Sequence, residues 1–270
     1  MPLQRLRKLV VFDRLLVRLL IVAPNRWRLK GALALDYRLG ARYRTTRDMD
    51  LSRQDSEADA TSDFLAVQSV ILDDYFTFTI RHVSGRGNAI DGIATRYHLI
   101  AHLAERRFEN IVVDVSFRDP VLEPTAMLQS PELLGFADIE AITVPAIPLE
   151  QHIAEKLHAY TRTYGDQRRS SRAKDLIDLV LVQDALSLTA GNLRIALDAT
   201  FSNRSTHPLP QKIPATPTDW DDSYATIAGE VDLNPDPAFG YRSIARLFDP
   251  ILSGDVPDES IWNPTTKHWE

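Results

Sequence analysis

The pattern of apolar residues changes at Pro148, and this change limits the folds that the chain can adopt. Before Pro148, short runs with the alternation of β-strands occur between segments that have helical spacing. After it, the periodic segments are all helical. The sequence therefore predicts an α/β (α+β) protein, in which a mixed sheet flanked by helices is followed by a helical C-terminal half. We expect one domain over residues 1–147 and a second domain over residues 148–270.

The expected elements follow from spacing, composition and turn residues. Helical spacing predicts eight helices, at residues 3–22, 31–39, 57–72, 149–164, 172–185, 188–201, 219–229 and 236–252. Alternation and β-type composition predict strands, at residues 46–52, 75–80, 95–103 and 111–117. The last three strands are expected to pair as a hairpin or meander, with a glycine-containing turn at residues 84–88. Gly40 is expected to cap the C-terminus of the second helix.

Composition and charge exclude several classes of protein. The 270 residues contain no cysteine, which excludes disulfides, thiolate metal sites and a cysteine nucleophile and fits a reducing cytoplasm. The net charge of −6 argues against a generic nucleic-acid binder. That average hides a basic N-terminus and an acidic segment from Asp219 onward. Arginines interrupt the apolar residues of the first helix too often for a membrane span or a signal peptide, so we expect an ordinary amphipathic helix.

Two aspartates separated by one residue, Asp48 and Asp50, lie in the first predicted strand. Alternate residues of a strand project from the same face, so the two carboxylates are expected to converge. Mg²⁺ prefers one or two carboxylates together with substrate phosphates. Lys30 and Gly31 precede the pair by a short helix, and a turn of small residues there can offer backbone N–H groups to phosphates. The alternative is a polar strand rim that faces water.

Asp114 is the best candidate for a third acid at a metal site. It is the only charged residue within an apolar strand. A carboxylate buried in such a strand costs free energy unless it is paired or bound to a metal. The alternative is an acid that accepts a hydrogen bond from a loop amide.

A second group of charged residues lies in the helical half. Lys156 can contact a triphosphate as a point charge. Basic residues follow it at a density that suits phosphate contacts, namely Arg162, Arg168, Arg169, Arg172 and Lys174. The alternative is a solvated loop between two helices. Asp175 and Asp178 are three residues apart and are expected on the same side of one helix, where either one could serve a catalytic role or a capping or ion-pairing role. The two histidines of this segment lack the spacing of a zinc site, and no Walker loop, dinucleotide fingerprint or serine-hydrolase motif occurs in the sequence.

Four motifs in this order resemble the AbiEii/AbiGii family of nucleotidyltransferase toxins, which includes MenT-like toxins of toxin–antitoxin systems. They are KGALAL at 30–35, RTTRDMDL at 44–51, IAEKLHA at 153–159 and RAKDLIDL at 172–179. The resemblance implies a fold like that of the DNA polymerase β nucleotidyltransferases. It also implies transfer of a nucleotide from an NTP to an acceptor, with release of pyrophosphate. In the best understood members the acceptor is the 3′ end of tRNA, whose extension blocks aminoacylation and growth.

The resemblance also implies roles for individual residues. Asp48 and Asp50 would hold Mg²⁺ and act in catalysis, and Asp114 joins them as a metal ligand on physical grounds. Lys30, Gly31, Thr46 and Lys156 would contact the nucleotide, with Lys156 also catalytic, and Asp175 would take the position of the late catalytic acid. Ala32 stands where family members often have glycine or serine, and Thr46 stands where serine is frequent. Nucleotide affinity or base choice could therefore differ from that of other members.

Further expectations concern the acceptor and the partners. A protein or small-molecule acceptor is the alternative to tRNA, and a degenerate protein that only binds nucleotide or its partner is a third hypothesis. A toxin of this kind implies a cognate antitoxin protein as partner and a location in the cytoplasm. No sustained heptad repeat indicates a coiled coil, so a monomer is expected.

Overall fold

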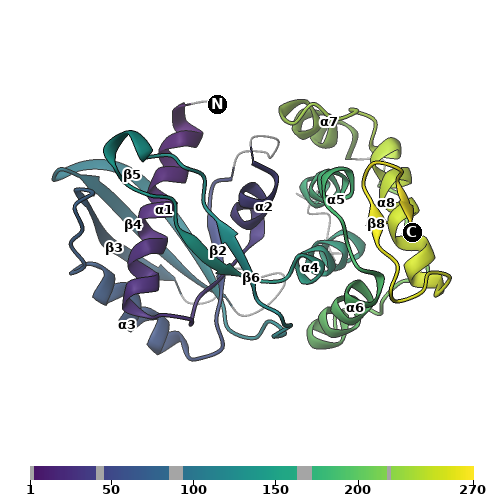
Figure 1. Ribbon diagram of the computed structural model, residues 1–270, viewed down its shortest axis with the longest axis horizontal. Coiled ribbons are helices and arrows are strands. Elements are labelled where there is room, and N and C mark those ends of the chain that lie inside the picture. The colour runs from purple at the N-terminus through teal and green to yellow at the C-terminus, as the bar shows by residue number, and fades with distance from the viewer. Residues whose placement is uncertain (1–2, 41–45, 85–93, 163–171, 218–219) are drawn as a thin grey trace. The chain divides into compact units, whose positions relative to one another are not determined.

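The computed structural model describes residues 3–40, 46–84, 94–162, 172–217 and 220–270. The chain divides into two compact units between Ile147 and Pro148 (Figure 1). The predicted α/β class is confirmed, because a mixed sheet with helices precedes a helical half. The assignment of separate domains to residues 1–147 and 148–270 stays a prediction, since compactness alone does not show that each unit folds by itself. The tip of the turn expected at residues 84–88 falls outside the described residues.

A mixed sheet organises the first unit. Within the described residues it has seven strands, in the order β3-β4-β5-β2-β1-β7-β6. They are β1 (Arg28–Lys30), β2 (Met49–Ser52), β3 (Phe76–Ser84), β4 (Ala94–Leu103), β5 (Arg106–Ser116), β6 (Ala126–Gln129) and β7 (Thr143–Ala146). The pairs β2–β5 and β1–β7 are parallel and the others are antiparallel. The predicted meander is confirmed as β3-β4-β5, whereas the short strands β1, β6 and β7 were not predicted.

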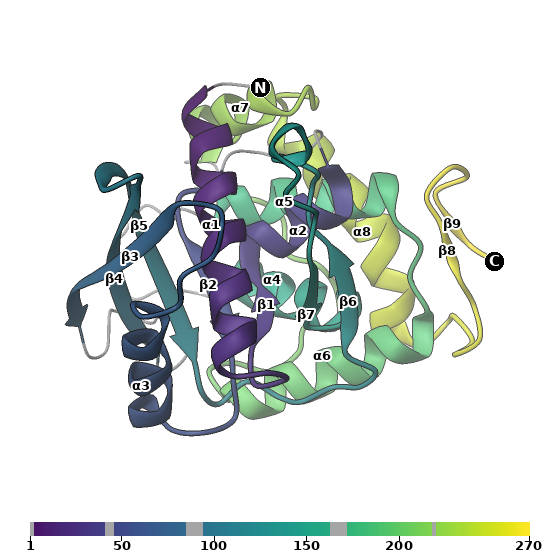
Figure 2. The same cartoon turned by 60° about the vertical axis from the view of Figure 1, so that its left-hand side comes forward.

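Helices α1 (Leu3–Val22) and α3 (Glu57–Val67) pack together over the sheet, with α1 against β5. Figures 1 and 2 show α1 running across the strands. The apolar side of α1 enters a continuous core with one face of the sheet, as its leucine spacing predicts. The short helix α2 (Gly31–Leu39) contacts β1, β2 and β6, and Gly40 closes it at a positive φ of 62°, as expected.

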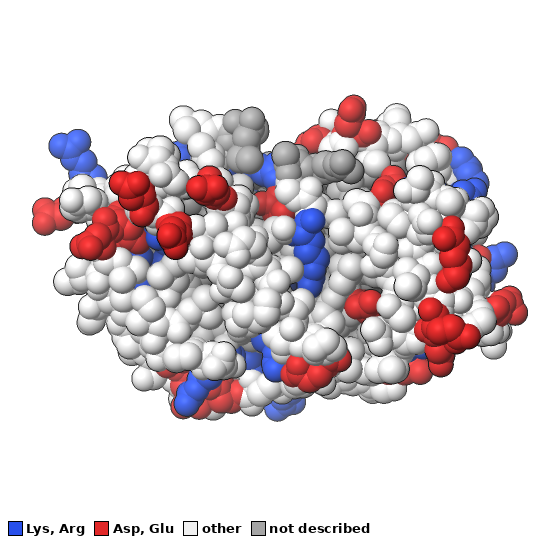
Figure 3. Space-filling view, in the orientation of Figure 1, with Lys and Arg blue, Asp and Glu red and all other residues white. Residues whose placement is uncertain are grey.

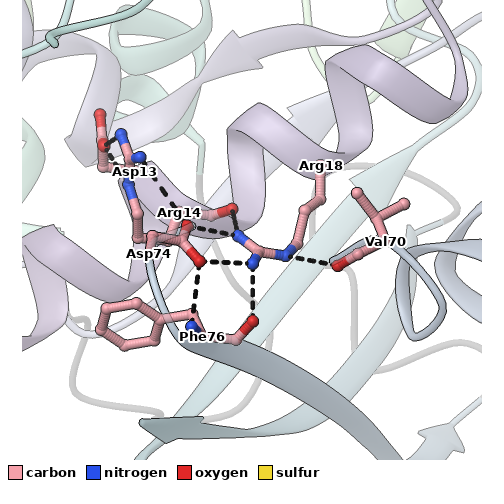
Figure 4. Close-up of polar contacts among 6 residues, drawn as sticks. All are labelled: Asp13, Arg14, Arg18, Val70, Asp74 and Phe76. Atoms are coloured by element: carbon pink, nitrogen blue, oxygen red, sulfur yellow. Dashed lines mark hydrogen bonds and ion pairs between the residues drawn. The ribbon is translucent and has the colours of Figure 1, made fainter. Parts of the chain in front are cut away.

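Helix α1 also carries a wholly buried guanidinium, that of Arg18 (Figure 4). Its two terminal nitrogens donate to the two carboxylate oxygens of Asp74, at 2.8 and 2.7 Å, and further bonds reach the carbonyls of Phe76 at 2.6 Å and Val70 at 3.2 Å. Burial raises the pKa of Asp74, but the hydrogen bonds from Arg18 and from the N–H of Phe76 more than offset this, so that the pKa lies below its ordinary value. These bonds need the chain beyond α3, and α3 accordingly ends at Val67 rather than at residue 72 as predicted.

The second unit is built from helices on helices. They are α4 (Leu149–Thr161), α5 (Ala173–Ala185), α6 (Ala190–Arg204), α7 (Asp221–Glu230) and α8 (Pro237–Ser253). Helix α4 packs on α5 and α6, and α5 packs on α7 and α8. A short hairpin of β8 (Trp262–Asn263) and β9 (His268–Trp269) ends the chain, and the indole of Trp262 donates to the carbonyl of Gln183 at 2.9 Å. Over the described residues, every helix falls short of the length and apolar character that a membrane span requires.

The substitution Asp74→Ala tests the buried ion pair. It leaves the Arg18 guanidinium without its counter-ion, so we expect the free energy of unfolding to fall by about 3–5 kcal/mol. Urea denaturation followed by circular dichroism measures this change. As a control, Arg26→Ala removes the exposed partner of Asp55, 3.4 Å away, and should lower the value by no more than about 1 kcal/mol. Equal effects of the two substitutions would contradict this account of Arg18.

Candidate active site

Four charged residues stand in one row across four adjacent strands of the first unit. In the register of the sheet, Lys30 of β1 lies opposite Asp50 of β2, Asp50 lies opposite Asp114 of β5, and Asp114 lies opposite Arg96 of β4. Residues that lie opposite one another on paired strands project from the same face. The row therefore has cations at its two ends and two carboxylates in the middle.

One face of the sheet is buried in the core, and the row lies on the other face, which is partly exposed. The four row residues are partly exposed, whereas neighbours such as Leu29, Tyr97 and Val113 are buried in the core. Alternation along each strand separates the two sets. The prediction that Asp114 lies in an apolar strand is correct. Its neighbours in sequence, Val113 and Val115, however, point to the buried face of the sheet, opposite to the face that carries Asp114.

Gly31 brings the start of α2 against Asp50. Its φ is +63°, a backbone conformation that residues with a side chain rarely adopt. A Cβ atom at this position would lie 1.9 Å from Oδ2 of Asp50. Only glycine fits at this point. The first turn of α2 carries backbone N–H groups that have no partner within the helix, and the N-terminal end of its dipole is positive. Backbone donors beside a carboxylate that can hold a metal suit a phosphate.

Lys30 is held by an acid that sequence analysis did not identify. Its Nζ lies 2.7 Å from Oδ2 of Asp119, whose carboxylate also accepts a hydrogen bond from the hydroxyl of Ser116. Lys30 has only 12% of its side chain exposed. Asp119 lies three residues after the end of β5, where the sequence indicates only that the chain leaves the sheet. The ammonium group therefore has a fixed position beside Asp50.

Asp114 is bound by Arg96. The Nε and Nη2 atoms of Arg96 donate to the two carboxylate oxygens, each at 2.7 Å. The pKa of Arg96 is raised by these hydrogen bonds; desolvation opposes this, and the charges of Asp114, Asp48 and Asp50 add to it. Arg96 thus stands in the field of all three acids. From the sequence, a metal ion or a loop amide was the expected partner of Asp114. Arg96 was not predicted, because only the register of β4 against β5 brings Arg96 and Asp114 together.

Asp48 lies directly before β2 and is half-buried. The hydroxyl of Thr46, expected beside the phosphates, donates to the backbone carbonyl of Asp48 at 2.8 Å. Within the described parts of the chain, no three Asp, Glu, His or Cys side chains form a group that could hold a metal ion. The roles of Asp48, Asp50 and Asp114 as a set of three ligands therefore stay a prediction. Asp48 and Asp50 alone match the one or two carboxylates that Mg²⁺ takes when substrate phosphates supply the other ligands.

In the second unit, Lys156 of α4 is held by both acids of α5. Its Nζ lies 2.5 Å from Oδ2 of Asp178 and 3.3 Å from Oδ1 of Asp175. Asp178 is completely buried, whereas Asp175 keeps a small exposed fraction and also binds Arg172 at 3.0 Å. The predicted placement of the two acids on one side of a helix is confirmed. The expectation that Lys156 contacts a triphosphate stays a prediction.

The remaining basic candidates are only partly covered. Arg162 and Arg172 are half-buried, and Arg168 and Arg169 fall outside the described residues. His158 is buried, and its Nε2 lies 2.8 Å from the hydroxyl of Thr206.

Comparison with known proteins identifies the family of this chain. The sequence matches the family described as "Nucleotidyl transferase AbiEii toxin, Type IV TA system" over residues 14–249. The chain belongs to the AbiEii nucleotidyltransferase toxin family. It is therefore a nucleotidyltransferase, and the resemblance found in its four motifs is confirmed. No curated protein matches the sequence.

Solved structures show the same fold. MenT4, a nucleotidyltransferase toxin from Mycobacterium tuberculosis, superposes with a TM-score of 0.54 at 23% identity, and the match covers 91% of each chain. JHP933 from Helicobacter pylori superposes with a TM-score of 0.51 at 16% identity, over 94% of this chain and 96% of that one. At these identities the similarity shows the fold of this AbiEii protein, and its site must be argued from its own residues.

Substitution of Gly31 tests the close approach of α2 to Asp50. Gly40, at the other end of the same helix, has a similar φ of +62° but no described atom within 4 Å of a Cβ, so it is a matched control. Gly40→Ala should cost about 1–3 kcal/mol of unfolding free energy from backbone strain alone, because its φ of 62° and ψ of −138° lie outside the left-handed helical region. Gly31→Ala should cost a further 1–3 kcal/mol, roughly, because the methyl group displaces Asp50. Equal losses, measured by urea denaturation, would show that Asp50 does not need this space.

Proposed function

We propose that this AbiEii protein is a Mg²⁺-dependent toxin that transfers nucleotides from an NTP to the 3′ end of tRNA and so blocks aminoacylation and growth. The observation that carries the proposal is the placement of Asp50 beside Asp114, with the start of α2 against it at Gly31. Family membership supplies the reaction class, and this geometry supplies carboxylates and backbone donors in one place. Pyrophosphate is the leaving group of the proposed reaction.

In the proposed reaction, groups of the chain itself position the substrates and neutralise the charge of the phosphates. Asp48 and Asp50 would hold the metal, which neutralises phosphate charge and activates the attacking oxygen when bound. The N–H groups at the start of α2 would donate hydrogen bonds to phosphate oxygens, with the ammonium of Lys30 beside them. Lys156 would contact the triphosphate, and Asp175 would act as the late acid.

The tRNA acceptor is supported by the family resemblance and by the basic segment that begins at Arg162. The net charge of −6 favours the alternative, a protein or small-molecule acceptor. On the face drawn in Figure 3, the described acidic side chains form several groups and the Lys and Arg side chains show no broad basic patch. Incubation with total RNA and protein extract in the presence of each labelled NTP distinguishes the acceptors, because label in the tRNA fraction alone supports the proposal and label in protein alone supports the alternative.

The proposal includes a partner and a setting. A cognate antitoxin protein would restrain the enzyme, as membership of a toxin–antitoxin family suggests. We infer action in the cytoplasm, where NTP and tRNA are found, and a monomer as the working form.

Replacement of the paired aspartates tests the metal role. We expect Asp48→Asn and Asp50→Asn each to lower transfer of labelled nucleotide by more than about a hundredfold, because the phosphate charge is no longer neutralised. Circular dichroism should show the wild-type fold. Asp138→Asn, which neutralises an exposed acid of the same unit, should retain wild-type activity. Full activity of Asp48→Asn would remove the metal assignment.

Separate substitution of Asp175 and Asp178 tests which acid is catalytic. An acid that touches substrate needs some exposed surface; Asp175 keeps 6% of its side chain exposed, whereas Asp178 has none. We expect Asp175→Asn to lower transfer by at least about a hundredfold and to lower the melting temperature less than Asp178→Asn does, because Lys156 keeps its nearer counter-ion. Asp178→Asn should lower the melting temperature by several degrees, because Lys156 loses its nearer counter-ion. Loss of transfer at unchanged stability in Asp178→Asn alone would move the catalytic role to Asp178.

A further inference from the structure

Arg96 and Asp114 form a bidentate ion pair within the candidate site. They lie opposite one another on β4 and β5, and two parallel N–H···O bonds of 2.7 Å join guanidinium and carboxylate. Such a fork is among the stronger charge-assisted contacts of proteins. Both carboxylate oxygens of Asp114 therefore already have a cationic partner.

The same guanidinium also interacts electrostatically with the other two acids. Asp50 is the neighbour of Asp114 on β2, and the charges of Asp48 and Asp50 help to raise the pKa of Arg96. Carboxylates that lie this close would repel one another strongly without cations among them. Lys30 supplies such a cation opposite Asp50, and Arg96 supplies one to Asp114.

Arg96 can leave this position more easily than a buried arginine can. Its side chain is 42% exposed, whereas that of Asp114 is 19% exposed, so the guanidinium has solvent to move into and the carboxylate does not. Arg18 provides the contrast, since its side chain is fully enclosed by its partners. Removal of Arg96 from Asp114 thus breaks two hydrogen bonds and lets the guanidinium enter solvent, while the carboxylate, 19% exposed, then requires another cation.

We propose that Arg96 is the resident counter-ion of Asp114 within the carboxylate cluster (Asp48, Asp50 and Asp114) and competes with a divalent metal ion for Asp114. The inference rests on the proposed metal role of Asp48 and Asp50 and deepens it. With Arg96 in place the cluster binds a bare metal ion weakly, and Asp114 becomes a ligand only when the guanidinium releases it. Arg96 is thereby a positioning residue that sets metal affinity and favours metal that arrives together with nucleotide phosphates.

A cross-strand pair that serves only the stability of the sheet is the competing explanation. It predicts that loss of Arg96 lowers stability and leaves metal affinity unchanged or weaker. Competition predicts the opposite change in metal affinity. The two explanations therefore predict changes of opposite sign in metal affinity when Arg96 is replaced.

The test is a titration of the full chain with Mn²⁺ alone, with free Mn²⁺ measured by electron paramagnetic resonance. We expect Arg96→Gln to tighten the dissociation constant for Mn²⁺ by about tenfold or more, because the carboxylates regain their full charge for the metal. In an Asp114→Asn background the same substitution should change it by about threefold or less, since the contested ligand is absent.

A matched control removes a cation from the same face of the sheet. Arg28 lies two residues before Lys30 on β1 and pairs with Glu123 at 3.0 Å. Arg28→Gln should leave the Mn²⁺ dissociation constant within about twofold of wild type. If Arg96→Gln does not fold, Arg96→Lys keeps the charge but loses the fork, and it should tighten Mn²⁺ binding by a smaller factor.

The outcomes separate the inference from the proposed function. An unchanged or weaker Mn²⁺ affinity in Arg96→Gln or Arg96→Lys, with binding that Asp48→Asn still abolishes, overturns the role of Arg96 and leaves the proposed function standing. Absence of Mn²⁺ binding in both wild type and Arg96→Gln overturns the metal role of Asp48 and Asp50 as well. Binding that appears or tightens in Arg96→Gln and is removed by Asp48→Asn supports both.

Discussion

The backbone hydrogen bonds that fix the register of β1, β2, β5 and β4 are the constraint on which the candidate site depends. A shift of one residue in any of these pairings would move a whole strand's side chains to the opposite face. The large apolar core on the other face prevents such a shift, because it would bring charged residues such as Asp50 or Arg96 into that core. Burial on one face thus determines the charge pattern on the other.

The two units hold their charged groups in different ways. In the first unit the acids lie at a half-buried surface and their cations come from neighbouring strands, while Asp119 of the loop after β5 holds one of these cations, Lys30. In the second unit Lys156 is enclosed by two acids of a single helix, so a change at either acid alters the environment of the lysine directly. The first arrangement allows exchange of partners with solvent or ligand, while the second holds one side chain in a fixed position. This difference is consistent with metal exchange in one case and with a preset ammonium donor in the other.

Sequence reasoning succeeded where the signal is local and periodic. The first helix and the meander follow from apolar spacing, and Gly40 follows from helix-capping chemistry. Short strands such as β1 contain too few residues to show a period, so they could not be identified. The partners of charged residues were missed for a different reason. Arg96 meets Asp114, and Asp119 meets Lys30, only through the pairing and order of strands, which no single segment of the sequence encodes.

The parallel pairing of β2 with β5 also orders the assembly of this site in time. Because parallel neighbours need a crossover, the chain must complete α3, β3 and β4 before Asp114 can reach the side of Asp50. Contacts of such long range form late and slowly in folding. A chain that is still emerging from the ribosome therefore has its two aspartates near residue 50 but lacks the neighbouring acid. Assembly of the candidate site therefore has to wait until the sheet has folded.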